Sequence, residues 1–111
     1  MSFRLSSESI VGPLLDPDTS AGGIVVFEGR VRSSNEGKPV LSLEYEAYGA
    51  LAEKEGARVV EEALARLPLT AAACVHRTGH LQLGDVAIRV EVAAAHRREA
   101  FEACEWIVDE I

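Results

Sequence analysis

The sequence has few cysteines and no long apolar run, and both absences limit where the protein can work. The two cysteines, Cys74 and Cys104, form neither a CxxC pair nor a disulfide framework, which favours a reducing compartment with both thiols packed as small apolar groups. Polar residues rather than an apolar signal segment follow the first few positions, and no apolar run approaches membrane-spanning length. We therefore expect a cytoplasmic protein, neither exported nor membrane-spanning.

Lysine is also scarce, because only Lys38 and Lys54 are lysines among 11 basic residues and the rest are arginines. The 18 acidic residues outnumber the basic ones, and the formal net charge of −7 disfavours nonspecific binding to nucleic acid or to an anionic membrane. Arginine, however, presents a planar guanidinium that can hold phosphate or carboxylate through two hydrogen bonds. The composition predicts no nucleic-acid and no membrane partner, yet it is compatible with a local anion site.

Length and hydrophobic periodicity predict a single domain over residues 1–111, of α/β composition and α+β type. A chain of 111 residues, 48% of them hydrophobic, can form one core without disulfide or metal staples. Apolar residues at helical spacing predict two principal helices over residues 48–67 and 96–111, and Pro68 ends the first. Alternating or continuous apolar runs predict strands at 3–5, 24–31, 41–47, 71–77 and 86–93, of which the second and third form an antiparallel pair.

Some local expectations are more specific. Residues 10–15 are expected to form a short helical piece, and residues 33–39 a polar connector with strong turn residues. The strand over 24–31 is expected to be covered on both faces, with a bulge at Gly29. The strand over 86–93 is expected to have an exposed face that carries both signs of charge. The last helix is expected to bury a stripe made of Phe101, Cys104, Val108 and Ile111.

A first candidate site is Arg30-Val31-Arg32, at the end of an apolar strand. Alternate residues of a strand point to one face, so Arg30 and Arg32 could grip one anion, for which phosphate is a natural candidate. The alternative is a pair of solvated arginines beside a loop.

A second candidate is His96-Arg97-Arg98, at the start of the last helix. Unpaired backbone N–H groups and the positive end of the helix dipole can act with cationic side chains to hold phosphate or carboxylate. The alternative is a surface helix whose arginines pair with Glu102 or Glu105 at helical spacing.

Metal binding and cysteine catalysis are both disfavoured. Cys74, His76 and His80 have ligand chemistry, but His80 lies beyond a turn and no fourth ligand has a recognisable spacing. Cys104 falls on the apolar stripe of the last helix, where burial suppresses the thiolate. We therefore expect packing roles for the thiols and no metal site.

The chain contains four ordered motifs, which are GIVVFEGRVR at 23–32, LEYEAY at 43–48, VHRTG at 75–79 and AHRREAFEA at 95–103. Together they resemble the large, catalytic subunit of molybdopterin synthase, the MoaE family. The resemblance covers nearly the whole chain from Gly22 onward, and its order and spacing make it more specific than either arginine cluster alone.

This resemblance implies a hammerhead-like α/β fold and a role in molybdenum cofactor biosynthesis. The family's enzyme, a sulfurtransferase, inserts two sulfurs into cyclic pyranopterin monophosphate to form the dithiolene of molybdopterin, and no metal or redox cofactor is required. The sulfur donor is a ubiquitin-like small subunit whose C-terminal Gly-Gly thiocarboxylate enters a pocket of the large subunit. Two copies of each subunit form a heterotetramer around a large-subunit homodimer.

Carried over residue by residue, the resemblance implies that Arg30, Val31 and Arg32 form the strand-end substrate-binding segment. His96 and Arg97 match the helix-start pair that reaches the site across the dimer interface. Phe27 matches an aromatic residue near the pocket, although a core role is equally consistent with its sequence context.

The catalytic lysines of the family lie in a tail beyond the segment that matches residues 109–111. This chain has neither lysine, and Lys54 matches a different family lysine on the first helix. The last helix has Asp109 and Glu110 where the dipole favours cations, and it has no stop signal before Ile111, so we expect the natural sequence to continue. Two alternatives are a noncatalytic relative that binds a ubiquitin-like carrier or phosphorylated ligand, and a dimeric structural domain with solvated arginines.

Overall fold

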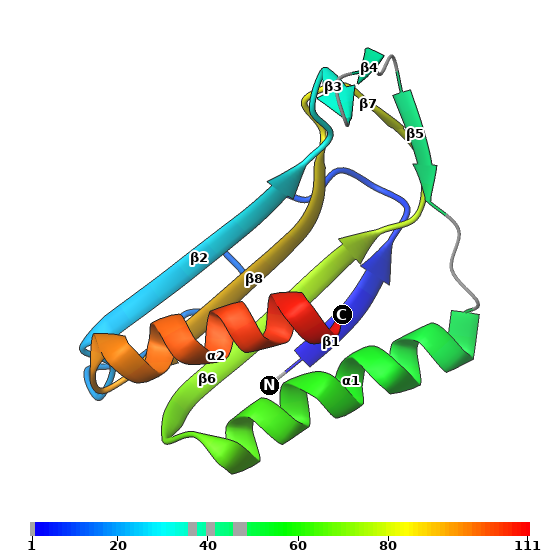
Figure 1. Cartoon of the computed structure of the whole chain (residues 1–111). Coiled ribbons are helices and arrows are strands. Elements are labelled where there is room, and N and C mark those ends of the chain that lie inside the picture. Colours follow the sequence, from blue (N-terminus) through cyan, green and yellow to red (C-terminus); the bar gives the residue numbers. More distant parts are fainter. Residues whose placement is uncertain (1, 36–37, 40–41, 46–48) are drawn as a thin grey trace.

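The computed structural model describes residues 2–35, 38–39, 42–45 and 49–111 (Figure 1). Both predicted helices and the strands expected near 3–5, 24–31, 71–77 and 86–93 are confirmed, with ends that differ by one or two residues. The elements are β1 (Ser2–Ser6), β2 (Gly23–Arg30), β3 (Ser34–Asn35), β4 (Lys38–Pro39), β5 (Ser42–Tyr45), α1 (Gly49–Arg66), β6 (Leu69–Arg77), β7 (Gly79–Gln82), β8 (Val86–Ala94) and α2 (Arg97–Glu110).

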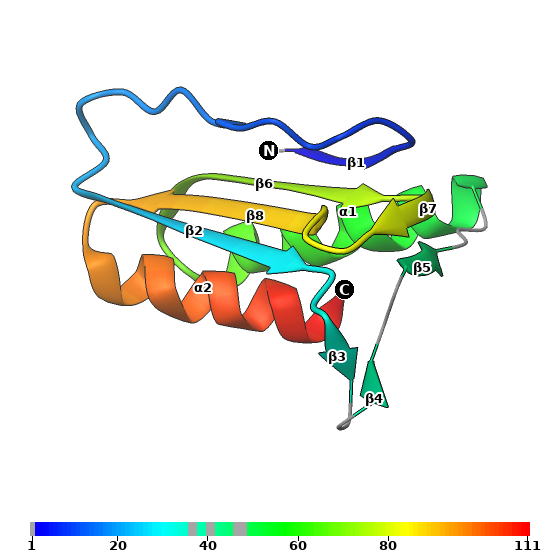
Figure 2. The ribbon, with the colours of Figure 1, turned by 90° about the horizontal axis from the view of Figure 1, so that it is seen from above.

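A four-stranded, mostly antiparallel sheet organises the fold. Its strand order is β1-β6-β8-β2, in which β1 runs parallel to β6 and the other neighbours are antiparallel. Both helices cover one face of this sheet, α1 over β1 and β6 and α2 over β8 and β2 (Figures 1 and 2). None of the helices in the described part of the chain is long and apolar enough to cross a membrane.

The main core lies between the sheet and the two helices, and it is built largely from alanine and valine. Small side chains let both helices approach the sheet closely, as Gly56 of α1 shows: a Cβ at this position would lie 2.3 Å from the ring of Phe3 on β1. The fully buried members of this core include Val60, Ala72, Cys74, Val90, Val92, Ala94, Ala100, Ala103 and Ile107.

An extended N-terminal segment covers the opposite face of the sheet, where the short helical piece over residues 10–15 was expected. That expectation is wrong: residues 7–22, which we call the covering segment, contain no helix (Figure 2). The residue before a proline avoids the helical region, which disfavours a helix through Pro13. The amides of Leu14 and Leu15 donate instead to the two carboxylate oxygens of Glu91, over 2.8 and 2.9 Å.

The expectation that the charged face of β8 is exposed is wrong, and Glu91 shows this most clearly. Its side chain is only 2% exposed, and it accepts a hydrogen bond of 2.6 Å from Arg89, whose guanidinium contacts Glu28 of β2 at 2.5 Å. Burial raises the pKa of Glu91, but the hydrogen bonds from Arg89 and from the two covering-segment amides outweigh it, so the pKa lies below its ordinary value. The charges on β8 therefore fasten the covering segment to the sheet.

The expected pairing of residues 24–31 with 41–47 is also wrong. In the structure β5 pairs antiparallel with β7, and β2 pairs with β8. Residues 41 and 46–47 of the predicted strand lie outside the described part. The polar connector over 33–39 contains the short antiparallel pair β3 and β4, and residues 36–37 are not described.

Strand β2 forms one edge of the sheet and is not covered on both faces, contrary to expectation. The side chains of Ile24, Val26 and Phe27 are 51%, 46% and 38% exposed. The bulge expected at Gly29 is confirmed, because the register with β8 shifts between Gly29 and Arg30.

The buried stripe of α2 differs from the prediction. Ala100, Ala103, Cys104 and Ile107 face the core, whereas Phe101 is 61% exposed and Ile111 also lies at the surface. The alanines permit the close approach to β8 and β2, so the larger Phe101 lies at the margin of this interface, where it lines a groove together with Val25.

Candidate anion site

The residues of the first candidate cluster lie where β2 ends. Arg30 closes the strand and Arg32 follows it, and both are exposed. Val31 between them is 3% exposed and packs with Leu81 and Ala87 in a second, smaller core. Its amide donates to the Asp85 carbonyl over 3.0 Å, so Val31 anchors the segment while the two flanking arginines reach solvent.

The second candidate cluster lies at the other end of β2. His96 caps α2 with an extended backbone and makes no side-chain capping bond, and Arg97 begins the helix; both are exposed. The helix can start here because Gly23 brings β2 close: a Cβ on Gly23 would lie 3.3 Å from the Arg97 Cα. The amides of the first turn and two cationic side chains thus share one location, as an anion site requires.

The two clusters do not meet within one chain. Seven residue steps separate Gly23 from Arg30 along β2, which corresponds to about 23 Å for an extended strand. Figures 1 and 2 show the start of α2 at one end of the sheet and the end of β2 at the other. An anion held by both clusters therefore needs a second molecule.

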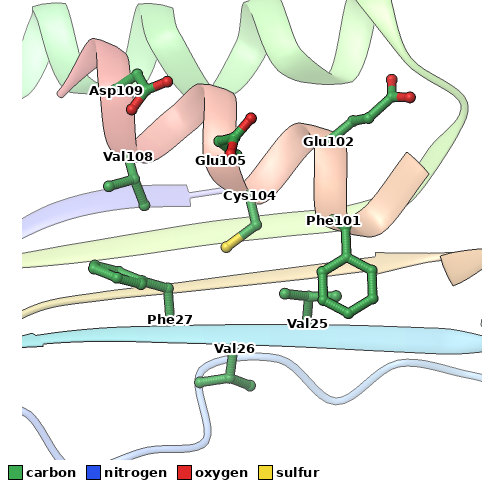
Figure 3. Close-up of a pocket in the computed structure, with 9 residues that line it drawn as sticks. All are labelled: Val25, Val26, Phe27, Phe101, Glu102, Cys104, Glu105, Val108 and Asp109. Atoms are coloured by element: carbon green, nitrogen blue, oxygen red, sulfur yellow. The ribbon is translucent and has the colours of Figure 1, made fainter. Parts of the chain in front are cut away.

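Phe27 lines an apolar groove of about 530 Å³ between β2 and α2 (Figure 3). Val25 and Phe27 project from β2 towards Cys104 and Val108 of α2, whereas Val26 projects away. Acidic side chains of α2 border the groove: Glu102, Glu105 and Asp109. The apolar floor and acidic border suit an uncharged group better than an anion.

Neither cysteine has the properties of a nucleophile. Burial raises the pKa of the Cys74 thiol to about 12, with a further contribution from Cys104, and burial raises the pKa of the Cys104 thiol to about 11. Both thiols belong to the main core, as the sequence predicts. No group of three metal-ligating side chains occurs within the described ranges.

Sequence reasoning missed Arg77, the last residue of β6. Its side chain is 7% exposed, and its buried Nε atom has no hydrogen-bond partner among the described residues. Arg77 stands in the VHRTG motif, but the sequence does not mark it for burial, because its surroundings come from distant strands: Ser6 of β1 lies beside it in register.

Taken together, the fold and these side chains define an α+β protein with a four-stranded sheet, two helices on one face and cationic groups at both ends of its edge strand. The family described as MoaE protein matches residues 4–111, and the chain belongs to that family.

Known relatives agree with this assignment in sequence and in fold. The molybdopterin synthase catalytic subunit of Pyrococcus abyssi is 54% identical over 93 residues, covering 84% of this chain and 63% of the relative. That of Oryza sativa subsp. indica is 43% identical over 94 residues, covering 85% of this chain and 49% of the relative. The crystal structure of molybdopterin synthase from Staphylococcus aureus superposes with a TM-score of 0.80 at 37% identity, covering 85% of this chain and 69% of that one. The chain thus spans 63% and 49% of the lengths of these two curated relatives.

Proposed function

We propose that the chain is a sulfurtransferase subunit of molybdopterin synthase. In this role it brings the thiocarboxylate of a ubiquitin-like carrier to cyclic pyranopterin monophosphate, and sulfur passes from the carrier to the pterin. The observation that carries the proposal is the family match over residues 4–111, which contains every residue of both cationic clusters. No metal or redox cofactor is part of this reaction.

The cationic side chains of the chain hold the phosphorylated pterin. Arg30 and Arg32 offer two guanidinium groups where β2 ends, and Val31 fixes the backbone between them. Guanidinium binds phosphate oxygens through paired, charge-assisted hydrogen bonds. His96 and Arg97 add a cationic helix start, whose amides favour the same kind of anion.

A homodimer brings the two clusters together. The outer edge of β2 has no partner strand in the described part of the chain, and Ile24, Val26 and Phe27 present apolar surface beside it. Unpaired edges and apolar strips of this kind are typical of interaction surfaces. An isologous interface with antiparallel β2 strands would place the start of one strand beside the end of the other. Each site would then contain Arg30 and Arg32 from one copy and His96 and Arg97 from its partner.

The carrier is the second partner, and two carriers on one dimer form the proposed heterotetramer. The anionic thiocarboxylate end of the carrier is expected at the cationic strand end rather than in the groove beside Phe27, whose acidic border would repel it. Phe27 then contributes apolar surface close to the cationic end of β2, three residues before Arg30.

The decisive assay measures dithiolene product after anaerobic mixing of the chain with thiocarboxylated carrier and cyclic pyranopterin monophosphate. A parallel reaction uses the chain extended by a lysine-bearing tail such as the family carries. Product from either reaction supports the proposal, provided that the Arg32→Ala variant makes less product. Product from the extended chain alone assigns the acyl-transfer step to the tail. Tight binding of carrier and pterin without product from either would favour a noncatalytic binding module, and absence of binding would refute both.

A further inference from the structure

Arg77 holds a positive charge that the described part of the protein does not balance. Its side chain is 7% exposed, its Nε atom is buried without a hydrogen-bond partner, and no carboxylate of the described residues forms an ion pair with it. A buried guanidinium N–H that has no hydrogen bond, on a side chain without a counter-charge, is unfavourable. The Nε–H of Arg77 therefore has an unused hydrogen bond that a group from outside these residues could accept.

Arg89 shows how the same sheet treats a structural arginine. Ala73 of β6 lies opposite Glu91, and Arg77 is four residues further along the strand, so Arg77 shares the face of Glu91 and Arg89 opposite the helices. Arg89 is more exposed than Arg77, at 15% of its side chain, yet it contacts the carboxylates of both Glu91 and Glu28. Arg89 is thus paired within the fold, whereas Arg77 has no carboxylate partner among the described residues.

The backbone around Arg77 is fixed, so the point from which its side chain projects is well defined. The carbonyl of Arg77 lies 2.8 Å from His76 Nδ1, and the amide of Thr78 donates to the Ser6 carbonyl over 2.9 Å. β6 is paired on both sides, by β1 and by β8. The fixed backbone and the burial of the side chain, which is 7% exposed, together lower the cost of ordering Arg77 around a ligand.

Arg77 also lies at the same end of the sheet as the first cationic cluster. His76 pairs with Ile88 of β8, and Arg30 pairs with Val86 of the same strand, so Arg77 and Arg30 are within one residue in register. Two strand spacings separate them, which is about 10 Å between backbones. Asp85 lies at this end too, and its carboxylate accepts the amide of Gln82 over 2.9 Å.

We propose that Arg77 is a further anion-binding residue, which takes an oxyanion of the phosphorylated ligand at the end of the sheet formed by β2 and β6. This inference rests on the proposed function for the identity of the ligand. Phosphate fits better than a carboxylate because three guanidinium groups share this end and phosphate can carry two charges to one carboxylate charge. Arg77 would supply the buried contact, and Arg30 and Arg32 the exposed ones.

The test compares Arg77→Met with Arg58→Met, a control that removes an exposed arginine paired with Glu55 and Glu62 on α1. Inorganic phosphate and pyrophosphate are titrated calorimetrically at constant ionic strength, and thermal unfolding is followed with and without each anion. We expect the wild type and Arg58→Met to bind and to gain thermal stability, and Arg77→Met to bind at least tenfold more weakly. Without anion, Arg77→Met should unfold at the same or a higher temperature, because it removes an unbalanced buried charge.

Arg77→Lys provides a second variant that keeps the charge but loses the paired hydrogen bonds, and about tenfold weaker binding is expected. The inference is overturned if Arg77→Met keeps the wild-type affinity, if the wild type binds neither anion, or if a Gly-Gly peptide carboxylate binds more tightly than phosphate. An Arg77→Met protein that unfolds at a lower temperature while Arg77→Lys binds normally would mean a structural role. Phosphate binding through Arg77 in a protein that makes no dithiolene even with the lysine-bearing tail would refute the proposed function and leave this site intact.

Discussion

Replacing Glu91 by glutamine should loosen the covering segment and destabilise the whole fold. The Glu91 carboxylate accepts the amides of Leu14 and Leu15 at 2.8 and 2.9 Å and the Arg89 guanidinium at 2.6 Å. Glutamine has the same shape, but it lacks the charge and turns an NH₂ group towards one of these donors. Breaking a buried ion pair by removing one partner costs about 3–5 kcal/mol, and we expect a loss of that size in the free energy of unfolding.

Urea unfolding followed by the fluorescence of Trp106, the single tryptophan, measures this loss. Hydrogen exchange at the Leu14 and Leu15 amides should accelerate in Glu91→Gln because those amides lose a charged acceptor. Glu28→Gln is the matched control: Glu28 contacts the same arginine, but at 37% exposure of its side chain its pair should contribute at most about 1 kcal/mol. A loss below about 1 kcal/mol for Glu91→Gln would refute the fastening role, since exposed pairs already reach that size.

The lowered pKa of Glu91 predicts how the stability of the fold depends on pH. The pKa of Glu91 is lower in the folded protein than in the unfolded chain, so its contribution is complete above the unfolded pKa. The contribution is lost as the pH falls through the folded pKa, because the folded state must then take up a proton. Unfolding of the wild type between pH 6 and acid should therefore show a pH dependence that Glu91→Gln lacks in part.

Three further predictions concern packing and assembly. Gly56→Ala should destabilise the fold by about 1–3 kcal/mol because its methyl group would meet the Phe3 ring at 2.3 Å, and Phe3→Leu should restore part of that loss in urea unfolding. Cys74 and Cys104 should resist a thiol reagent at pH 7 in the native protein and react fully in urea, since burial raises both pKa values; rapid native labelling would contradict this. Ile24→Glu should shift sedimentation towards monomer with an unchanged circular dichroism spectrum, whereas an unchanged dimer would show that the interface lies away from β2.

The parts of the fold that sequence predicts well are those fixed by local patterns. The spacing of Gly56, Val59, Val60 and Ala63 defines the buried face of α1, and Pro68 ends that helix. Strands β6 and β8 follow from β-branched and alternating residues in the same way. In each case the residues that decide the structure lie within about ten positions of one another in the chain.

The sequence-based predictions fail where residues far apart in the chain determine the local structure. Residues 10–15 form no helix because their amides bond to Glu91, 76 or 77 residues away. β5 pairs with β7 rather than β2, and no periodicity within a strand specifies its neighbour. In α2 the prediction favoured the large Phe101, but the space against β8 and β2 admits alanine at 100 and 103.

The candidate site was only partly predictable for the same reason. Arg30, Arg32, His96 and Arg97 stand out in the sequence because they cluster at element ends, and the structure places them on the surface. Their separation along β2 is visible only once the strand and the start of α2 are placed together. The burial of Arg77 depends on β1 and β8, which lie far from it in sequence.

The central claim is that one site is assembled from two chains, and mixing two binding-deficient variants tests it most directly. Arg32→Ala and Arg97→Ala should each bind cyclic pyranopterin monophosphate weakly in calorimetry. After unfolding and refolding together, half of the dimers should be mixed and each should regain one intact site, so about a quarter of the wild-type sites should bind tightly. No tight binding after mixing, or full binding by either variant alone, would contradict a shared site.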